Sequence, residues 1–488
     1  PLNWPEVWGQ PLRVEEVSGS AGRSPVPAVP VSPEVAMADY RQTLAQAQGA
    51  AGWALAPTTV AVLQAVGHGV LQPQPLNLTL ADAVALLRPL AALVREQRDV
   101  ALRALPGTLS RQRRSLRWMR DCVLRLRGDL LVPSRGLRFV AATCRHPGIT
   151  ELEAARSDHV LQQLAQQQRQ TPASFMWMLG DQIYADARAG LASGSSPIEA
   201  LLPRYREAFA SPGFKQLARS LPLYMVMDDH EIADNWSRDE ERLGSQRAVL
   251  ARNALSAFAA FQRAHGPAPM GPQGHDGVVS HADAAFLSLN TRVHRSRALG
   301  PGRRLLEPGQ WQLLQDWLLQ EDARGAHAKF IATGSVLAPG LEGGQGWPSP
   351  RSTDNWQLVE TERQRVLDFI AERRIRNVVF LSGDYHCAAS ATITFSHSPV
   401  KAYALVTPAL HAPLRFANVA AGEVLAQETV PLPGGHAQIA AQAWNGDGWL
   451  ECELQPLAGG GQRLRAAFRM QRFDMAEPDH RTMEWELR

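Results

Sequence analysis

The chain has 488 residues, of which 45% are hydrophobic and 20% charged, as in a globular protein with a sizeable core. Its 50 Lys and Arg residues nearly balance its 47 Asp and Glu residues, so the net charge of +3 gives no indication of a nucleic-acid or membrane surface. The 4 cysteines form no CxxC pair, which argues against a disulfide scaffold or a zinc finger. No apolar run is long enough to span a bilayer and no signal peptide is visible, which leaves the cytoplasm and, after processing, the periplasm or the exterior as compartments.

Residues 1–135 are expected to form an irregular arm followed by a mostly helical extension. Pro, Gly and Ser are frequent in residues 1–35, and stretches rich in Ala, Leu, Gln and Arg follow. The stretch 111–127 is basic with one apolar stripe, and we interpret it as a packed helix with a solvated face rather than a nucleic-acid or lipid patch. No cluster of catalytic residue types occurs in this part of the chain.

From Leu137 to His386 apolar runs alternate with helical patterns, so residues 136–488 are expected to form one large α/β domain with a β-rich C-terminal tail. Strands are expected at 137–144, 175–179, 223–227, 284–290, 328–333 and 377–381. Helices are expected at 150–168, 197–210, 212–219, 247–265, 308–319 and 354–374, the last capped by Asp354. In the helix at 247–265 the inward side chains are expected to be Val249, Leu250, Leu255, Phe258 and Phe261. The Gly-, Pro- and Ser-rich stretch 339–353 is long enough to be a substrate-side loop.

The segment 221–236, LPLYMVMDDHEIADNW, joins an apolar strand directly to Asp228, Asp229, His230 and Glu231. Buried charges must be paired or bind a metal, and open α/β sheets bind ligands beyond the carboxyl ends of their strands. The alternative is a helix N-terminus, where acidic residues suit the helix dipole and cap free N–H groups. The same pattern at three more strand ends favours a shared polar site.

Four strand ends together supply a set of metal-ligand types. They carry Cys144; Asp181 and Tyr184; Asp228, Asp229, His230 and Asn235; and Asp384 and His386. Thiolate, phenolate and imidazole groups suit iron, whereas carboxylates suit a harder divalent ion. A carboxylate between two cations about 4 Å apart can bridge them, and such pairs clamp the oxygens of a displacement at phosphorus.

This constellation resembles the PhoD-like alkaline phosphatase/phosphodiesterase family of the metallophosphoesterase superfamily. The motifs are TCRHPG at 143–148, LGDQIYAD at 179–186, MDDHEIADNW at 227–236 and LSGDYH at 381–386, in the order of the family. The resemblance covers roughly residues 137–410. It implies an α/β fold with a metallophosphoesterase-like β-sandwich core flanked by helices, and a catalytic domain at 136–488.

The resemblance also implies roles for single residues. Cys144 stands where a thiolate holds a ferric ion, Asp181 where a carboxylate bridges both metals, and Tyr184 where a phenolate binds iron. Asp384 and His386 stand in the place of a ligand pair with one member on each metal.

The remaining implied residues lie in the acidic motif. Asp229 occupies the position of a metal-binding Asn and is expected to bind the second ion, Ca²⁺ or another divalent metal. Asp228 and Asn235 are further candidate ligands, and which acidic residue of this motif binds metal is left open. His230 is expected to stabilise charge on the transferring phosphoryl group or to protonate the leaving oxygen.

Several neighbours are assigned less specific roles. Arg145 and Arg292 are candidates for gripping phosphate, although each could equally form a salt bridge to the acidic residues. Asp186 and Asp234 are expected to be caps or supporting carboxylates. Cys387 is expected in the core. A relative would read Asp-Thr-Arg where this chain has Asn-Thr-Arg at 290–292, so the role of that strand end is open.

The expected activity is hydrolysis of phosphoric esters, and a phosphodiesterase is favoured. It would use a metal-bound hydroxide at a two- or three-metal site with Fe³⁺ and Ca²⁺. The alternatives are an alkaline phosphomonoesterase and a non-catalytic binding protein on the same scaffold. The expected partner is a small phosphate ester, with nucleic acid or phospholipid only as a substrate. The oligomeric state is not predicted.

Overall fold

The computed structural model describes residues 136–147, 158–188, 191–192, 198–263, 269–270, 275–281, 284–298, 302–340, 354–412, 424–458, 460–471 and 478–488. The expectations for residues 1–135, for the first turns of the helix at 150–168 and for most of the loop at 339–353 lie outside the described residues. None of the described helices combines the length and the apolar character needed to cross a membrane.

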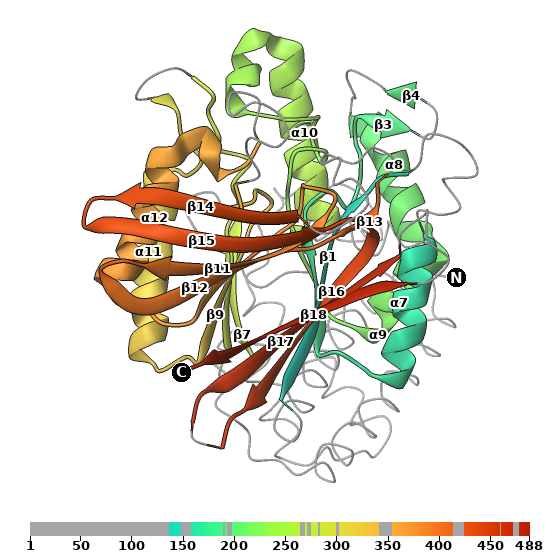
Figure 1. Cartoon of the computed structure of the whole chain (residues 1–488). Helices are drawn as coiled ribbons and strands as arrows, with labels where there is room; N and C mark the ends of the chain where they lie inside the picture. Colours follow the sequence, from blue (N-terminus) through green and yellow to red (C-terminus); the bar gives the residue numbers. More distant parts are fainter. Residues whose placement is uncertain are drawn as a thin grey trace, which may run out of the picture. The chain divides into compact units, whose positions relative to one another are not determined.

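One sheet carries the first three predicted strands (Figure 1). Its strand order is β18-β17-β16-β1-β2-β5, and β13 pairs with β1 beyond this path. The strands are β1 (Leu137–Arg145), β2 (Phe175–Leu179), β5 (Leu223–Val226), β13 (Ala409–His411), β16 (Asp447–Pro456), β17 (Gln462–Gln471) and β18 (Asp479–Leu487). Because β1, β2 and β5 are parallel, their carboxyl ends reach the same edge of this sheet.

A second sheet has the order β14-β15-β11-β12-β10-β9-β8-β7-β6. Its strands are β6 (Pro269–Met270), β7 (Asp276–His281), β8 (Ala284–Ser288), β9 (Ala328–Ala332), β10 (Val378–Ser382), β11 (Ala388–Phe395), β12 (Ser398–Val406), β14 (Val424–Leu432) and β15 (Gly435–Trp444). The central strands β8, β9, β10 and β12 are parallel, and β9 and β10 are buried along their whole length. The short strands β3 (Ala187–Arg188) and β4 (Leu191–Ala192) pair separately.

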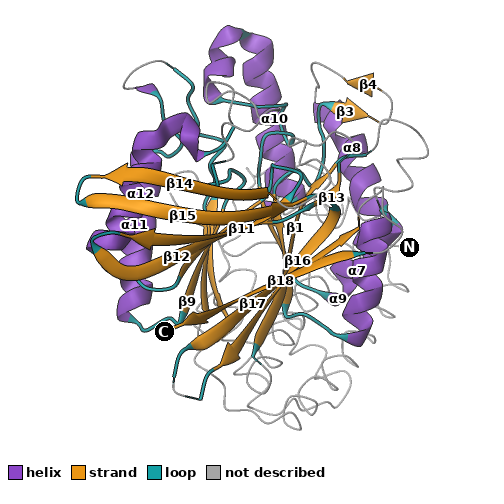
Figure 2. Ribbon diagram, in the orientation of Figure 1, coloured by secondary structure: helices purple, strands orange, loops and turns teal. Residues whose placement is uncertain are grey.

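Helices flank both sheets (Figure 2). They are α7 (His159–Gln170), α8 (Ile198–Ala210), α9 (Pro212–Ser220), α10 (Ser245–Phe261), α11 (Pro308–Ala323) and α12 (Glu360–Glu372), with 3-10 turns η1 (Arg238–Leu243) and η4 (Trp356–Val359). Leu314 of α11 and Ile370 of α12 join Ile331 and Phe380 of the second sheet in one apolar cluster. These two helices therefore cover one face of that sheet.

Aromatic rings connect the two sheets. Phe139 of β1 lies 5.3 Å from Phe286 of β8 and 5.1 Å from Phe330 of β9, measured between ring centroids. Phe175 of β2 lies 5.2 Å from Phe286, and all four rings are buried. The molecule is thus a mixed α/β protein with two sheets and helices, as the sequence predicts at this level.

Two local predictions are wrong. Val249 of α10 is 41% exposed rather than inward, and Leu255 is half-buried, because three alanines share the buried face with Leu250, Phe258 and Phe261. Asp354 does not cap a helix, since α12 begins only at Glu360, after η4, whose N-cap is Asn355.

Candidate metal centre

Ligand-type side chains from both sheets converge at the carboxyl ends of the parallel strands. Cys144 is at the end of β1, Asp181 follows β2, and Asp384 and His386 follow β10. Three groups of side chains have ligand atoms within 4.8 Å of one another. They are Cys144, Asp181 and His386; Asp181, Asp229 and His230; and Asp181, Asp228, Asp229 and Asp384. Asp181 belongs to all three groups, and its role as a bridging carboxylate stays a prediction.

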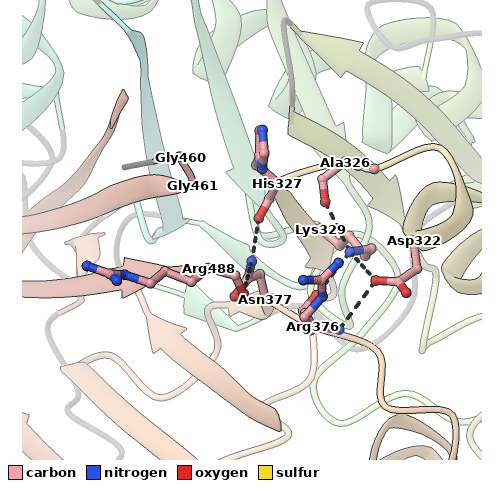
Figure 3. A pocket seen from close by; sticks show the side chains of 10 residues that line it. Asp322, Ala326, His327, Lys329, Arg376, Asn377, Gly460, Gly461 and Arg488 are labelled. Carbon is pink, nitrogen blue, oxygen red and sulfur yellow. Dashed lines mark hydrogen bonds and ion pairs between the residues drawn. The ribbon is translucent and has the colours of Figure 1, made fainter. Parts of the chain in front are cut away.

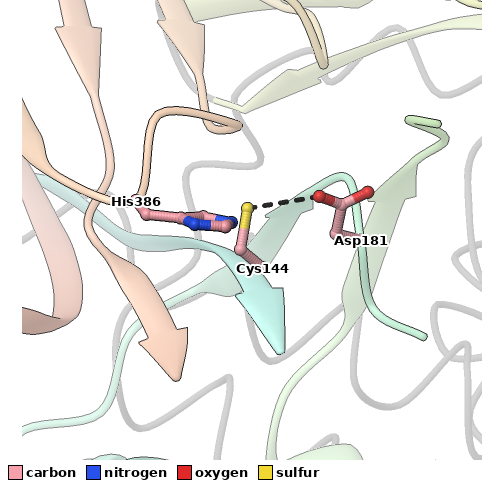
Figure 4. Close-up of side chains that lie close together, drawn as sticks. All are labelled: Cys144, Asp181 and His386. Atoms are coloured by element: carbon pink, nitrogen blue, oxygen red, sulfur yellow. Dashed lines mark hydrogen bonds between the residues drawn. The ribbon is translucent and has the colours of Figure 1, made fainter. Parts of the chain in front are cut away.

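The first group contains the softer donors (Figure 4). The Sγ atom of Cys144 lies 3.4 Å from Oδ2 of Asp181, and the imidazole of His386 lies on the other side of the sulfur. The hydroxyl of Tyr184 is 3.3 Å from Nε2 of His386. Burial raises the pKa of the Cys144 thiol and of the Tyr184 phenol well above their ordinary values. The structure therefore brings these four residues together, and their assignment to iron stays a prediction.

The second group consists of four buried carboxylates. Burial raises the pKa of Asp181 and of Asp384 well above the ordinary value, and that of Asp228 to about 6. Among the described residues, Oδ2 of Asp228, Oδ1 of Asp229 and Oδ2 of Asp384 have no hydrogen-bond partner. So many buried carboxylates cannot all be ionised unless cations lie between them. Oxygen donors of this kind fit a hard divalent cation such as Ca²⁺.

Asp229 differs from the other three carboxylates. Burial would raise its pKa, but Arg292, His230 and the backbone N–H of Asn235 together hold the pKa below the ordinary value. The Asn235 N–H donates to Oδ2 of Asp229 over 2.5 Å. The positive charges around Asp229 thus favour its ionised form, whereas the side chain of Asn235 stays a predicted ligand.

The imidazole of His230 is held by its neighbours. Its Nδ1 lies 2.9 Å from Oδ1 of Asp186, and its ring packs on Tyr184 with centroids 4.1 Å apart. Burial lowers the pKa of His230, but Asp229, Asp181 and Asp186 outweigh burial and raise the pKa well above 6.5. Asp186 also accepts the backbone N–H of Asp234, so it acts as the supporting carboxylate that the sequence predicts.

Arg292 is fully buried beside the carboxylates. Its Nε donates to Oδ1 of Asp228 over 2.7 Å, and its Nη2 lies 3.6 Å from Oδ1 of Asp229. Its Nη1 pairs with Asp354, a residue that sequence reasoning missed because Asp354 looks like a helix cap. The close spacing of Arg292, Arg295 and Arg297 was the sequence signal for a shared acidic partner. All three bind the one carboxylate of Asp354.

Arg145 points elsewhere. Its guanidinium donates to Oδ1 of Asp158 over 3.1 Å and to the carbonyl of Ala208 in α8 over 2.5 Å. Of the two alternatives raised for Arg145, phosphate gripping and a salt bridge, these contacts correspond to a salt bridge, although its partner is not one of the clustered acids.

The Asn-Thr-Arg strand end has a local explanation. Oδ1 of Asn290 accepts the backbone N–H groups of Arg292 and Val293, over 3.0 and 2.9 Å. A neutral amide performs this turn-capping task as well as a carboxylate would. Cys387 is buried beside Val336, in agreement with its predicted place in the core.

The backbone of the site adopts an uncommon conformation. Positive φ angles occur at Cys144 (47°), Asp181 (55°), Asn235 (55°), Asp384 (66°) and His386 (53°). Such angles cost of order 1–3 kcal/mol each outside glycine and cluster at functional sites. Five of the seven described non-glycine residues with positive φ thus coincide with predicted ligands.

A separate cavity of about 330 Å³ lies at the other end of the second sheet (Figure 3). It is lined by residues that include Asp322 at the end of α11, and Lys329 and Arg376 at the starts of β9 and β10. Those strands have about five residues each, which separates this cavity from the ligand cluster by about 16 Å. It is not part of the metal centre.

Fold and site together define a class: α/β proteins with two sheets whose strand ends bring together side chains of the types that bind metal ions. The model of the PhoD-like phosphatase family matches residues 158–456, more than half of the chain. The protein belongs to the PhoD-like phosphatase family. It is 25% identical over 211 residues to alkaline phosphatase D of Bacillus subtilis (strain 168), which covers 39% of this chain and about a third (35%) of that relative. A solved structure of PhoD superposes with a TM-score of 0.53 at 17% identity, over 73% of this chain and 70% of the other, which supports the fold.

Proposed function

We propose that this protein is a metal-dependent hydrolase of phosphoric esters and that its preferred substrate is a phosphodiester. The observation that carries the proposal is the convergence of Asp181, Asp228, Asp229 and Asp384 on one another, with three carboxylate oxygens left without a hydrogen-bond partner among the described residues. The proposal extends to a metallophosphoesterase-like sandwich of the two sheets and to a catalytic domain at 136–488, separate from an extension at 1–135.

The donor chemistry divides the ligands between two kinds of ion. Cys144, Tyr184 and His386 would hold Fe³⁺, and Asp228, Asp229 and Asp384 would hold Ca²⁺ or another divalent ion, with Asn235 as a further ligand. Asp181 lies within 4.8 Å of members of both sets and would be shared. When bound, the metal ions supply charge neutralisation and acidify water to a nucleophile near neutral pH.

His230 is the residue proposed to move a proton. Asp186 binds Nδ1 and fixes the ring, and the surrounding carboxylates favour the imidazolium. The proton on the ring is then available to the departing oxygen of the ester, which is a general-acid role.

Arg292 is proposed to neutralise the negative charge of the clustered carboxylates rather than to contact the substrate. Its guanidinium is occupied by Asp228 and Asp354, so it offsets part of the negative charge that the metal ligands bring together. A direct phosphate contact by Arg145 also stays a prediction, and it requires the guanidinium to leave Asp158.

An alkaline phosphomonoesterase is the second candidate, because the relative at 25% identity bears the name alkaline phosphatase D. A non-catalytic binding protein is disfavoured, since competent residues occupy every predicted ligand position. Nucleic acids and phospholipids are proposed only as substrates, because both contain phosphodiester bonds.

The test compares bis(p-nitrophenyl) phosphate with p-nitrophenyl phosphate as substrates of the purified protein. We expect hydrolysis of the diester that stops after chelation and returns with Ca²⁺, and slower hydrolysis of the monoester. Faster turnover of the monoester would replace the first candidate by the second. Fully metallated protein that cleaves neither compound would argue against hydrolysis of simple phosphoric esters.

A further inference from the structure

Glu231 directly follows His230 but is not among the clustered ligands. Its side chain is fully buried, and both carboxylate oxygens accept backbone N–H groups. Oε2 accepts from Asp228 over 2.8 Å and from Asp181 over 3.1 Å, and Oε1 accepts from Gln182 over 2.9 Å. One carboxylate thereby binds the backbone of two separate loops, the one after β2 and the one after β5.

These two loops carry the ligands of the carboxylate group. Asp181 has a φ angle of 55°, and its Oδ1 accepts the backbone N–H of His230 over 3.3 Å. Without the acceptor on Glu231, three buried N–H groups would lose their partner, and each such loss is unfavourable. The direction of the Asp181 and Asp228 side chains therefore depends on a carboxylate that does not face the ligand cluster.

Glu231 is in turn held from the helices. The Gln262 side chain, just after α10, donates from Nε2 to Oε1 of Glu231 over 2.9 Å. The hydroxyl of Tyr205 in α8 donates to Oε1 of Gln262 over 2.6 Å. All three side chains are buried, so water cannot take the place of any of these partners.

We propose that Glu231 is a positioning residue of the metal centre, which fixes the two strand-end loops so that Asp181 and Asp228 converge on one cation. The chain from Tyr205 through Gln262 fixes Glu231 in this position. This inference rests on the proposed metal-dependent function, and it concerns metal affinity rather than the reaction itself. Supporting residues of this kind typically change metal affinity roughly 10- to 100-fold.

The experiment titrates Ca²⁺ into metal-stripped protein by calorimetry and compares the wild type with Glu231→Gln. The Gln side chain keeps the size but places an N–H₂ group against at least one backbone donor. We expect affinity to fall roughly 10- to 100-fold and the rise in melting temperature on Ca²⁺ addition to shrink. A wild type that binds no Ca²⁺ contradicts the proposed metal site, whereas equal binding by both proteins overturns only the role of Glu231.

A purely structural role gives a different result. It would lower the melting temperatures of the metal-free and Ca²⁺-loaded variant by the same amount and leave the Ca²⁺ affinity unchanged, which would overturn the proposal.

Tyr205→Phe tests the same network if Glu231→Gln does not fold. It removes only the hydroxyl that holds Gln262, and we expect a roughly 3- to 10-fold loss of Ca²⁺ affinity. Tyr403→Phe in β12 is the matched control, because it removes the hydroxyl of another buried tyrosine, whose ring packs on Trp485. Identical affinities of Tyr205→Phe and Tyr403→Phe would contradict the proposal.

Discussion

The two ends of the parallel strands differ in how their buried charges are balanced. At the starts of β9 and β10, Nζ of Lys329 has three acceptors: Oδ1 of Asp322 at 2.9 Å, and the carbonyls of Arg376 and Ala326 at 3.0 and 3.1 Å. At the carboxyl ends, the carboxylates outnumber the cations, and three of their oxygens lack a hydrogen-bond partner among the described residues. A balanced buried charge stabilises the fold, whereas an unbalanced cluster indicates that a ligand completes it.

The largest effect is expected from Asp181→Asn at the unbalanced end. Asn retains the shape and tolerates the φ angle of 55°, but it loses the shared negative charge. Activity should fall by more than about 100-fold, beyond what supporting residues cost, and metal content should fall with it. The measurements are the hydrolysis rate and elemental analysis. Asp322→Asn is the matched control and should keep both, and an unimpaired Asp181→Asn would refute the shared ligand.

Tyr184→Phe should change the colour of the protein. A phenolate on ferric iron absorbs visible light, and only a bound cation will ionise a phenol whose pKa is raised by burial. We expect the visible band of the iron-loaded protein to bleach or shift. Tyr385→Phe should leave it intact, because that hydroxyl bonds to Asn355. A colourless wild type with stoichiometric zinc would contradict the iron assignment.

Lys329→Met tests the end of the parallel strands at which the buried charges are balanced, the starts of β9 and β10. The substitution leaves two carbonyls and Asp322 without their buried donor, so the free energy of unfolding should fall by about 1–3 kcal/mol. Denaturant unfolding of metal-free protein measures this change. Catalytic activity and metal content at saturating metal should be unchanged, and a loss of metal would show that the two ends are coupled.

An effect of comparable size, which depends on pH, is expected at another balanced pair, Arg363 and Glu428, whose nitrogen and oxygen atoms lie 2.5 and 2.7 Å apart. Burial would raise the pKa of Glu428, but Arg363 lowers it below the ordinary value of 4.5. The pair therefore stabilises the fold fully above about pH 4.5 and loses this contribution as the pH falls through the lowered pKa. Glu428→Gln should cost about 1.5–3 kcal/mol at pH 7 and progressively less in acid.

Urea unfolding of Glu428→Gln between pH 3 and pH 7 measures this dependence. Glu372→Gln is the matched control, since that glutamate is exposed at the end of α12. A cost that stays constant across the range would show that packing, not charge, accounts for the loss.

The ligand types of the metal centre could be predicted from the sequence because they follow apolar strands directly. An apolar run ending in Asp181 or Asp384 identifies both the strand and the edge at which its polar residues gather. The sequence could also predict β2, α8 and α9 closely, since each has clear periodicity and turn residues at its ends.

Side-chain directions could not be predicted in the same way. Arg145 at the end of β1 binds Asp158 at the N-cap of α7, and Arg292 reaches Asp354 across 62 positions of the sequence (354 − 292). Glu231 appeared only as one more acid in its motif, whereas its partners lie on two loops and a helix end. Such contacts depend on which elements pack together, and no local pattern specifies that.

The positive φ angles at Cys144, Asp181, Asp384 and His386 restrict how the metal specificity of this protein could be re-engineered. Branched side chains such as Val, Ile and Thr are poorly tolerated at these angles, and Asn, Asp, His and Gly are tolerated best. A mutant library at these positions should therefore be enriched for amide, carboxylate and imidazole donors before any selection on metal binding. The backbone alone would bias the outcome toward oxygen and nitrogen ligands.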